Sequence, residues 1–196
     1  MIENNREKIK EEYEAIQSFS ESLDKKFVAS KANEKFNRYT NIAPFDDNRV
    51  VLNDDEFEND YINASYVNVS KIILHSKSFT ISFIVSIKGY HYPREYIAAQ
   101  GPKPNTGHDF WRMVLQHKVE SVVMLTSLIE DNKVKCHEYF PKLNGSITFA
   151  NICITCTYEQ NYSMYIKRFM EVETVREQRR KRATEMNRLL MRIYVL

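Results

Sequence analysis

Three cysteines are the residues of this 196-residue chain whose chemistry could define a function: Cys136, Cys153 and Cys156. A cysteine thiolate can attack an electrophile or bind a metal. The Cys153-x-x-Cys156 spacing occurs in redox and zinc sites, but a zinc site needs a second pair of Cys or His ligands, which the sequence lacks. The alternating pattern around them predicts a strand with the two cysteines on opposite faces. We therefore interpret them as ordinary core or surface cysteines and predict no metal site.

Five short strings of aromatic, polar and basic residues follow one another in order between residues 36 and 141. They are Phe36-Asn37-Arg38-Tyr39 with Asn41-Ile42, Asp60-Tyr61-Ile62-Asn63-Ala64-Ser65, Tyr96-Ile97-Ala98-Ala99-Gln100-Gly101-Pro102, Phe110-Trp111-Arg112-Met113, and Val122-Val123-Met124-Leu125 leading to Lys135-Cys136-His137-Glu138-Tyr139-Phe140-Pro141. In this order the strings resemble the N-terminal part of a phosphotyrosine-specific protein tyrosine phosphatase domain, especially of the receptor type.

The resemblance implies a substrate-binding role for four residues. A phosphotyrosine pocket needs aromatic walls, because the substrate ring is flat and apolar. In the family the tyrosine of the first string, here Tyr39, stacks on that ring. Two residues later the family usually has an acid that anchors the substrate backbone, and here the uncharged Asn41 takes its place. Glu130 and Lys135 resemble a mobile loop beside the active site. The alternatives are a buried structural tyrosine for Tyr39 and a solvated charged hairpin for Glu130 and Lys135.

The remaining motif residues are expected to hold the scaffold together. An Arg and an Asp beside turns predict a buried hydrogen-bonded pair, or a network, that ties loops to one another. Cys136 matches a buried structural cysteine of the family and not its nucleophile. The residues assigned to this structural group are Asn37, Arg38, Asp60, Tyr61, Asn63, Gln100, Gly101, Pro102 and Trp111.

The resemblance also implies catalytic machinery that the printed sequence does not contain. The family signatures are H-C-x5-R-[S/T], which supplies the nucleophile and a phosphate-binding arginine, and W-P-D, which supplies the general acid. Neither string occurs, since the last cysteine is Cys156 and the single tryptophan is Trp111. We predict no catalytic residue, no cofactor and no phosphatase activity for the chain as it stands. A non-catalytic phosphotyrosine-binding or decoy module and an inert truncated product remain the alternatives.

The elements that must position these residues divide the chain into three segments. Residues 1–24 are predicted to be helical, because Ile9, Tyr13 and Ile16 recur at helical spacing among charged residues. Residues 25–172 form the partial phosphatase domain, with 69–88 as an apparent insertion that would add a hairpin or an exposed apolar strand. Residues 173–196 are predicted to form a basic helical tail that departs from the family.

Within the domain, strands are expected at 49–52, 61–67, 95–99, 121–125, 147–158 and 163–172. A helix is expected from 106 to 118, with Thr106 and Asp109 as a capping box. Helices and strands alternate, so the predicted class is α/β (α+β): a highly twisted mixed sheet flanked by helices and only partly built.

Composition limits the partners. The net charge is +2, with nine Lys or Arg and four Glu among residues 167–196. The basic run Arg179–Arg182 lacks interleaved aromatic residues for base stacking, so no nucleic acid is expected. The longest apolar stretch, residues 79–87, is too short to span a bilayer, and the charged N-terminus resembles no secretory signal. We expect a cytoplasmic chain, soluble or part of a receptor-type parent, whose partner is a phosphotyrosine-containing protein or peptide.

Overall fold

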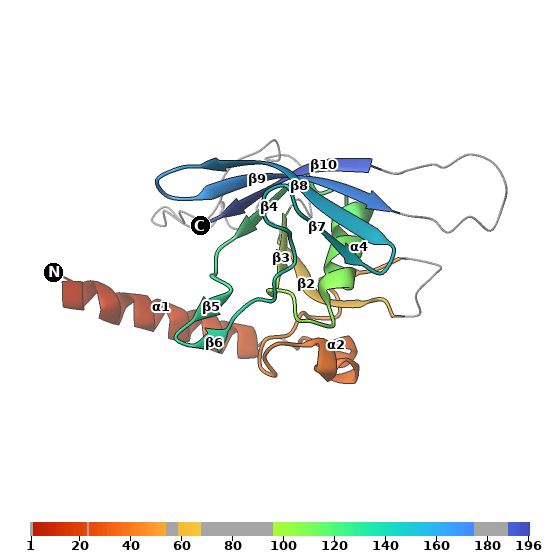
Figure 1. Ribbon diagram of the computed structural model, residues 1–196. Helices are drawn as coiled ribbons and strands as arrows, with labels where there is room; N and C mark the ends of the chain where they lie inside the picture. The colour runs from red at the N-terminus through yellow and green to blue at the C-terminus, as the bar shows by residue number, and fades with distance from the viewer. Residues whose placement is uncertain (1, 23, 54–58, 68–95, 175–187) are drawn as a thin grey trace.

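The computed structural model describes residues 2–22, 24–53, 59–67, 96–174 and 188–196 (Figure 1). The apparent insertion at 69–88 and the basic run at 179–182 lie outside these residues. The chain begins with helix α1 (Ile2–Ser22), which confirms the helical reading of the N-terminus. Within the described residues, no helix combines the length and the apolarity needed to cross a membrane.

Two short helical turns follow α1, α2 (Val28–Ala32) and the 3-10 helix η1 (Glu34–Phe36). The carboxylate of Asp46 accepts hydrogen bonds from the first two backbone N–H groups of α2, at 2.8 Å from Val28 and 3.0 Å from Ala29. It thereby satisfies donors that a helix start leaves without an intrahelical partner. This contact fixes the entry of the chain into the segment that carries Asn37, Arg38 and Tyr39.

The first sheet has three antiparallel strands in the order β1-β2-β3. They are β1 (Arg49–Val51), β2 (Tyr61–Val67) and β3 (Tyr96–Ala99), each within a residue of its predicted position. The first four residues of β2, Tyr61 to Ala64, are all buried. This strand therefore carries two of the motif residues, Tyr61 and Asn63, into the interior.

The second sheet has five strands in the order β4-β10-β9-β8-β7. They are β4 (Ser121–Met124), β7 (Ser146–Phe149), β8 (Ile152–Asn161), β9 (Ile166–Thr174) and β10 (Arg188–Val195). Strand β10 runs parallel to β4 and antiparallel to β9, so the sheet is mixed. The predicted α/β class is confirmed.

Strand β10 corrects the prediction of a helical tail. Residues 188–195 form an inner strand of the five-stranded sheet, between β4 and β9. Leucine, methionine and arginine favour helices in isolation, which misled the prediction. The same residues alternate, with Met191 and Ile193 fully buried and Leu190 exposed. Because two neighbouring strands offer backbone partners, this alternation outweighs the helical propensity.

The predicted strand at 147–158 is also corrected, because it contains a turn. Strands β7 and β8 form a hairpin whose turn includes Ala150, with φ of 50°. Strand β8 then continues to Asn161, and the next turn falls at 162–165 rather than at residues 159–162. Neither glycine nor proline marks the first turn, and Asn151 is its single turn-forming residue, so the local signal for this turn is weak.

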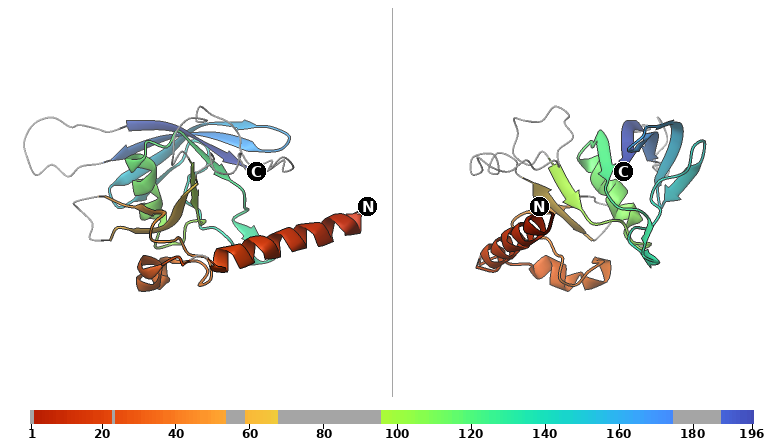
Figure 2. Two further views of the ribbon diagram at one scale, coloured as in Figure 1. Left: turned by 180° about the vertical axis from the view of Figure 1, so that it is seen from behind. Right: turned by 90° about the vertical axis from the view of Figure 1, so that its left-hand side faces the viewer.

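Helix α4 (Gly107–Gln116) lies between the two larger sheets (Figures 1 and 2). It buries Phe110, Trp111 and Val114. The predicted capping box does not form, because the Thr106 hydroxyl accepts the backbone N–H of Lys103 at 2.9 Å. Asp109 instead accepts a hydrogen bond from Arg112 at 3.0 Å.

A two-stranded hairpin projects beside this body, formed by β5 (Ile129–Glu130) and β6 (Lys133–Val134). Its two turn residues, Asp131 and Asn132, have φ of 48° and 59°. Positive φ at both central positions is the requirement of a type I′ turn, and Asp and Asn tolerate it. The hairpin carries Glu130 and leads directly into Lys135.

Candidate functional site

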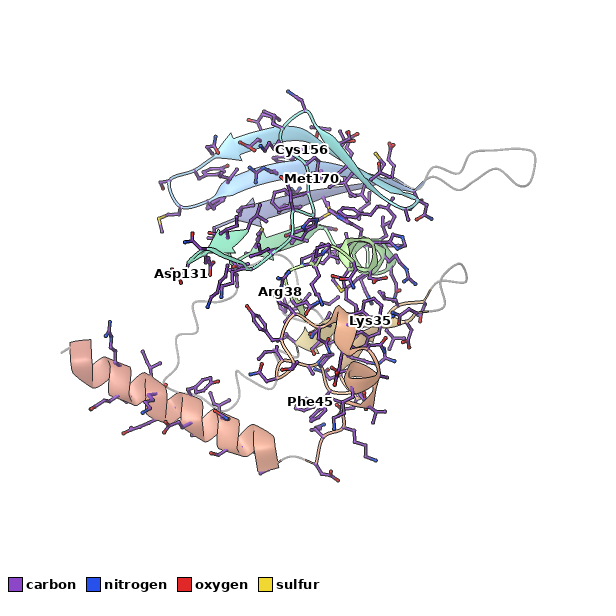
Figure 3. The ribbon with its side chains drawn as sticks, turned by 60° about the horizontal axis from the view of Figure 1, so that its bottom comes forward. Lys35, Arg38, Phe45, Asp131, Cys156 and Met170 are labelled. Carbon is purple, nitrogen blue, oxygen red and sulfur yellow. The ribbon has the colours of Figure 1, made fainter. Side chains whose placement is uncertain are left out.

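Arg38 joins three segments that are distant in the sequence. Its Nη2 donates to the carbonyls of Pro102 at 2.8 Å and Gly101 at 3.1 Å, and its Nε also donates to Gly101 at 3.2 Å. Its Nη1 donates to the carbonyl of Val134, at the end of β6, at 3.2 Å. A guanidinium carries five N–H donors, so it can donate to several carbonyls at once. Figure 3 shows Arg38 between the segment of Lys35 and the hairpin tip at Asp131.

Gln100 fixes the same junction from the opposite side. Its side-chain oxygen accepts the backbone N–H of Arg38 at 2.8 Å, and its amide donates to the carbonyl of Phe36 at 2.7 Å. A Cβ on Gly101 would lie 3.0 Å from the carbonyl oxygen of Lys135 and 3.1 Å from Cys136, so the two segments approach too closely for a larger residue. The Gln100-Gly101-Pro102 string therefore fixes the position of the Arg38 segment.

Asn37 is the centre of a buried polar network. Its Oδ1 accepts hydrogen bonds from the Tyr61 hydroxyl at 2.6 Å and the Asn63 amide at 2.9 Å. Its own amide donates to the Ser30 hydroxyl at 2.9 Å, while the Asn63 amide also reaches the carbonyl of Ile42 at 2.8 Å. Burial raises the pKa of Tyr61, so this hydroxyl stays protonated and remains a donor. The network fixes the loop on both sides of Tyr39.

Asp60 and Arg38, which the sequence suggested as a pair or as members of one network, do not contact each other. Asp60 pairs with Arg49 of β1 at 2.7 Å, whereas Arg38 bonds to backbone carbonyls. Trp111 is fully buried in α4 and its indole N–H donates to the carbonyl of Tyr139 at 2.8 Å. The first contact joins β1 to the start of β2, and the second joins α4 to the segment of Tyr139.

Tyr39 itself lies at the surface, with 46% of its side chain exposed, and Asn41 is exposed too. The alternative of a buried structural tyrosine is therefore wrong. Tyr39 directly follows Arg38, and Lys135 directly follows Val134, so the Arg38–Val134 hydrogen bond holds the two segments side by side. The fold thus brings the segments of Tyr39 and Lys135 together, and we call the edge that these two segments form the rim.

Glu130 forms its hydrogen bonds with the segment just before its own hairpin. Its carboxylate accepts hydrogen bonds from the Thr126 hydroxyl at 2.8 Å and from the backbone N–H of Ser127 at 3.0 Å. These two bonds, with a smaller effect of the Lys135 charge, hold the pKa of Glu130 below its usual value. Its exposed position fits the alternative of a solvated charged hairpin. Its two hydrogen bonds fix the start of that hairpin.

None of the cysteines has the surroundings of a nucleophile. Cys136 is buried against Gly101, and burial raises its pKa to about 11 although the charge of Arg38 opposes the shift. Burial likewise raises the pKa of Cys156. Cys153 lies half-buried opposite Glu173 on β9. The described residues contain no cluster of three or more His, Cys, Asp or Glu that could hold a metal.

Two residues of the site were missed by sequence reasoning. Ser30 accepts the Asn37 amide inside the network. Lys103 extends its ammonium to the carbonyls of Lys35 at 2.5 Å and Asn37 at 2.9 Å. Lys103 directly follows the Gln100-Gly101-Pro102 string, so its position was a usable signal. Ser30 offered none, because its role depends on where α2 packs.

The comparisons with known proteins agree with this geometry. The family model described as protein-tyrosine phosphatase matches residues 33–191, past the boundary predicted at 173 and into β10. The chain is 35% identical over 176 residues to "Tyrosine-protein phosphatase Lar-like" of Caenorhabditis elegans, covering 89% of this chain and 7% of that protein.

Two human proteins are similar as well. "Phosphatidylinositol phosphatase PTPRQ" is 35% identical over 87% of this chain and 7% of its own length. "Tyrosine-protein phosphatase non-receptor type 4" is 39% identical over 68% of this chain and 12% of its own length. The chain thus spans a small part of the relatives that it matches. From the strings between residues 36 and 141, the scaffold that they build and the match over residues 33–191, the chain belongs to the protein-tyrosine phosphatase family.

Proposed function

We propose that this chain provides the substrate-facing rim of a phosphotyrosine phosphatase domain and that its 196 residues have no phosphatase activity by themselves. The observation that carries the proposal is the exposed Tyr39 ring, on a segment that the Arg38–Val134 hydrogen bond holds against the segment of Lys135. The base of this rim is built from the hydrogen bonds of Asn37 and Gln100.

The rim suits a phosphorylated aromatic ring. The exposed face of Tyr39 can stack on the substrate ring, in an offset or edge-to-face arrangement. The ammonium of Lys135 supplies a positive charge on the neighbouring segment for a phosphate. Asn41 can still hydrogen-bond a peptide backbone, but it lacks the charge of an acid, so the peptide is held weakly. Because the relatives' names include both tyrosine and phosphatidylinositol phosphatases, the test includes a phosphoinositide.

The lack of activity follows from the chemistry of the thiols. Hydrolysis through a phosphocysteine needs a thiolate at neutral pH, next to backbone N–H groups and an arginine that bind the phosphate oxygens. Cys136 and Cys156 are buried with raised pKa values, and the sequence has no H-C-x5-R or W-P-D string. The three cysteines form no disulfide, which fits the cytoplasmic location that we also propose.

Two measurements on the purified chain test the proposal. We expect no turnover of p-nitrophenyl phosphate above buffer. We expect weak binding of a phosphotyrosine peptide, reduced by about 2–10-fold in Tyr39→Ala because one stacking contact is lost. Tyr158→Ala removes another exposed tyrosine, far from the rim on β8, and should leave binding unchanged.

The outcomes separate the alternatives. Turnover that persists after purification would contradict the absence of activity. Binding without turnover supports a decoy or recognition module, whereas no binding of either the peptide or phosphatidylinositol phosphate vesicles identifies an inert product. Binding of the vesicles alone, with dependence on Tyr39, would replace phosphotyrosine by a phosphoinositide as the substrate class. Equal losses in Tyr39→Ala and Tyr158→Ala would contradict the assignment of the rim.

A further inference from the structure

The five-stranded sheet has an open face on the side away from α4. Met170, Val172 and Ile193 on its other face are buried in the core. Side chains alternate along a strand, so the neighbours of these residues along β9 and β10 lie on the open face. In Figure 1 helix α4 lies below this sheet, and no described helix lies above it. The composition of the open face therefore indicates what it binds.

The strand register sets two neighbouring rows of side chains on the open face. The first row joins Tyr158 of β8 to Phe169 of β9 and Arg192 of β10. The second row lies two residues away on each of the same strands. Together the rows hold two cations, three aromatic rings and no acidic residue. The members of the second row are Gln160, Lys167 and Tyr194.

The rings on the open face contact one another in a continuous series. The ring centroids of Tyr158 and Phe169 lie 5.5 Å apart. The Lys167 ammonium lies 4.9 Å from the Phe169 centroid and 5.6 Å from the Tyr194 centroid, so it bridges the two rings. We call the series that begins at Tyr158 the aromatic row.

The aromatic row continues into the turn between β8 and β9. The ring of Tyr194 lies 5.9 Å from that of Tyr165, which stacks on Tyr162 at 4.6 Å. Tyr158 and Tyr162, the two ends of the row, are 54% and 42% exposed. Their separation along the chain corresponds to about 13 Å of extended strand. The row thus offers two accessible rings, with Lys167 between them in the series.

The two cations beside the aromatic row limit the kind of partner. Lys167 and Arg192 are half-buried, and neither forms an ion pair with a carboxylate among the described residues. An apolar partner would bury both charges without a counter-ion, which is costly. A second copy of the same face would bring like charges together. A polyanion satisfies both cations, so the charges favour a negatively charged chain.

Single-stranded nucleic acid matches both parts of this surface. Its phosphates pair with cations, and its unstacked bases stack on aromatic rings. The fold therefore creates the interleaving of rings and cations that the basic run at 179–182 lacks in the sequence. An acidic peptide would neutralise the cations but would leave the exposed rings without flat partners. The exposed Gln160 amide both donates and accepts hydrogen bonds, as the ribose 2′-hydroxyl of RNA does.

We propose that the open face of β8, β9 and β10 is a binding surface for single-stranded RNA. Bases stack on the exposed rings of Tyr158 and Tyr162, while Lys167 and Arg192 contact the phosphates. Stacking accepts any base, so the binding has little sequence preference. The surface shares no residue with the rim at Tyr39, and it does not depend on the function proposed for the rim.

Fluorescence anisotropy of a labelled oligouridylate with the full chain tests the charges. An oligomer of about 12 nucleotides lies within the site sizes of single-strand binders. Binding should be saturable, and its logarithm should fall with the logarithm of salt with a slope of about −1.4, for about two phosphate contacts. Lys167→Gln or Arg192→Gln should weaken binding and reduce this slope by about 0.7. Lys8→Gln, an exposed lysine on α1, is the matched control and should change neither value.

The same assay tests the stacking. Tyr158→Ala should weaken binding by about 5–150-fold, because one base loses its stacking partner. Tyr158→Phe keeps the ring and should stay within about twofold of the intact chain. Tyr13→Ala removes a tyrosine of α1 that is 66% exposed and should have no effect. The urea midpoint from Trp111 fluorescence verifies that each variant is folded.

The outcomes separate this surface from its alternatives. An intact chain without saturable binding, or equal losses in Tyr158→Ala and Tyr13→Ala, would overturn the proposal. Duplex RNA that binds as tightly as the single strand would exclude stacking, because its bases are already paired and stacked. Equal binding of oligodeoxyuridylate would overturn the assignment to RNA. Polyglutamate that binds with the same dependence on Lys167 and Arg192 would replace RNA by an acidic protein as the partner.

Discussion

Asn37 illustrates at the scale of single residues how this site is held. One carbonyl oxygen accepts hydrogen bonds from both Tyr61 and Asn63, in a region where all three side chains are buried. A buried donor that loses its partner costs about 1–3 kcal/mol, which exceeds the net gain of an ordinary hydrogen bond. The loop of Tyr39 therefore depends on this oxygen more than on any exposed contact.

A double-mutant cycle measures that dependence. Asn37→Ala should lower the free energy of unfolding by about 2–3 kcal/mol, because it removes the buried acceptor that the Tyr61 hydroxyl and an Asn63 donor share. Tyr61→Phe should cost about 1 kcal/mol, and the double variant should cost less than the sum by at least about 0.5 kcal/mol. Urea denaturation gives the values, with Tyr158→Phe as an exposed control. Strict additivity would show that the two side chains are not coupled.

The buried thiol of Cys136 predicts a loss of stability in alkali. Its pKa is raised by burial from 9.0 to about 11, so the native thiol keeps its proton at a pH where the unfolded thiol ionises. The contribution is complete below about pH 8 and is lost as the pH rises from about 9 to about 11, by at most about 2–3 kcal/mol. Cys136→Ala should flatten this part of the profile.

The measurement is the free energy of unfolding against pH for both chains. Burial, with a smaller effect of the nearby Cys136, also raises the pKa of Tyr139. The part of its alkaline loss that comes from burial is present in both chains. If the two profiles keep the same slope between pH 9 and 11, the Cys136 thiol does not ionise differently on folding.

At the scale of elements, the close approach of α4 to β7 depends on one glycine. A Cβ on Gly107 would lie 2.5 Å from Cε1 of Phe149, closer than atoms can pack. Elsewhere a Gly→Ala change in a helix with ordinary φ stabilises a protein through the unfolded state. Here we expect the clash with Phe149 to make the change destabilising, because α4 carries Trp111 and packs between the sheets.

Gly107→Ala should therefore lower the free energy of unfolding by about 1–3 kcal/mol, the usual range for an overpacked core. In a Phe149→Leu background, where the ring is gone, the same change should be neutral or stabilising. Thermal or urea unfolding of the four chains gives both effects. A loss of equal size in both backgrounds would show that Phe149 is not the obstacle.

At the scale of the whole molecule, one hydrophobic core connects both larger sheets. Val50 and Ile62 of the first sheet, Trp111 and Val114 of α4 and Ile193 of the second sheet belong to the same buried cluster. Neither sheet can keep its inner face covered when the other is lost, because α4 lies between them. The described body should behave as one cooperative unit.

Coincident transitions test this cooperativity. Trp111 is the single tryptophan and is fully buried, so its fluorescence reports the core, whereas far-ultraviolet circular dichroism reports the backbone. Both should give the same urea midpoint. Two separate midpoints would show that the sheets unfold independently. Ile9→Glu with Ile16→Glu should leave the midpoint unchanged, because both side chains are exposed on α1 and lie outside the buried cluster.

The sequence by itself determined the family, the α/β class and most element positions, because these depend on local order and periodicity. The strand of Tyr61–Val67 coincides with its predicted range, and helix α4 lies within two residues of its own. Tertiary structure decided the rest. Residues 188–195 became a strand because β4 and β9 offer backbone partners. Arg38 bonds to the carbonyls of Gly101, Pro102 and Val134 because the fold, and not the sequence spacing, brings those acceptors within reach.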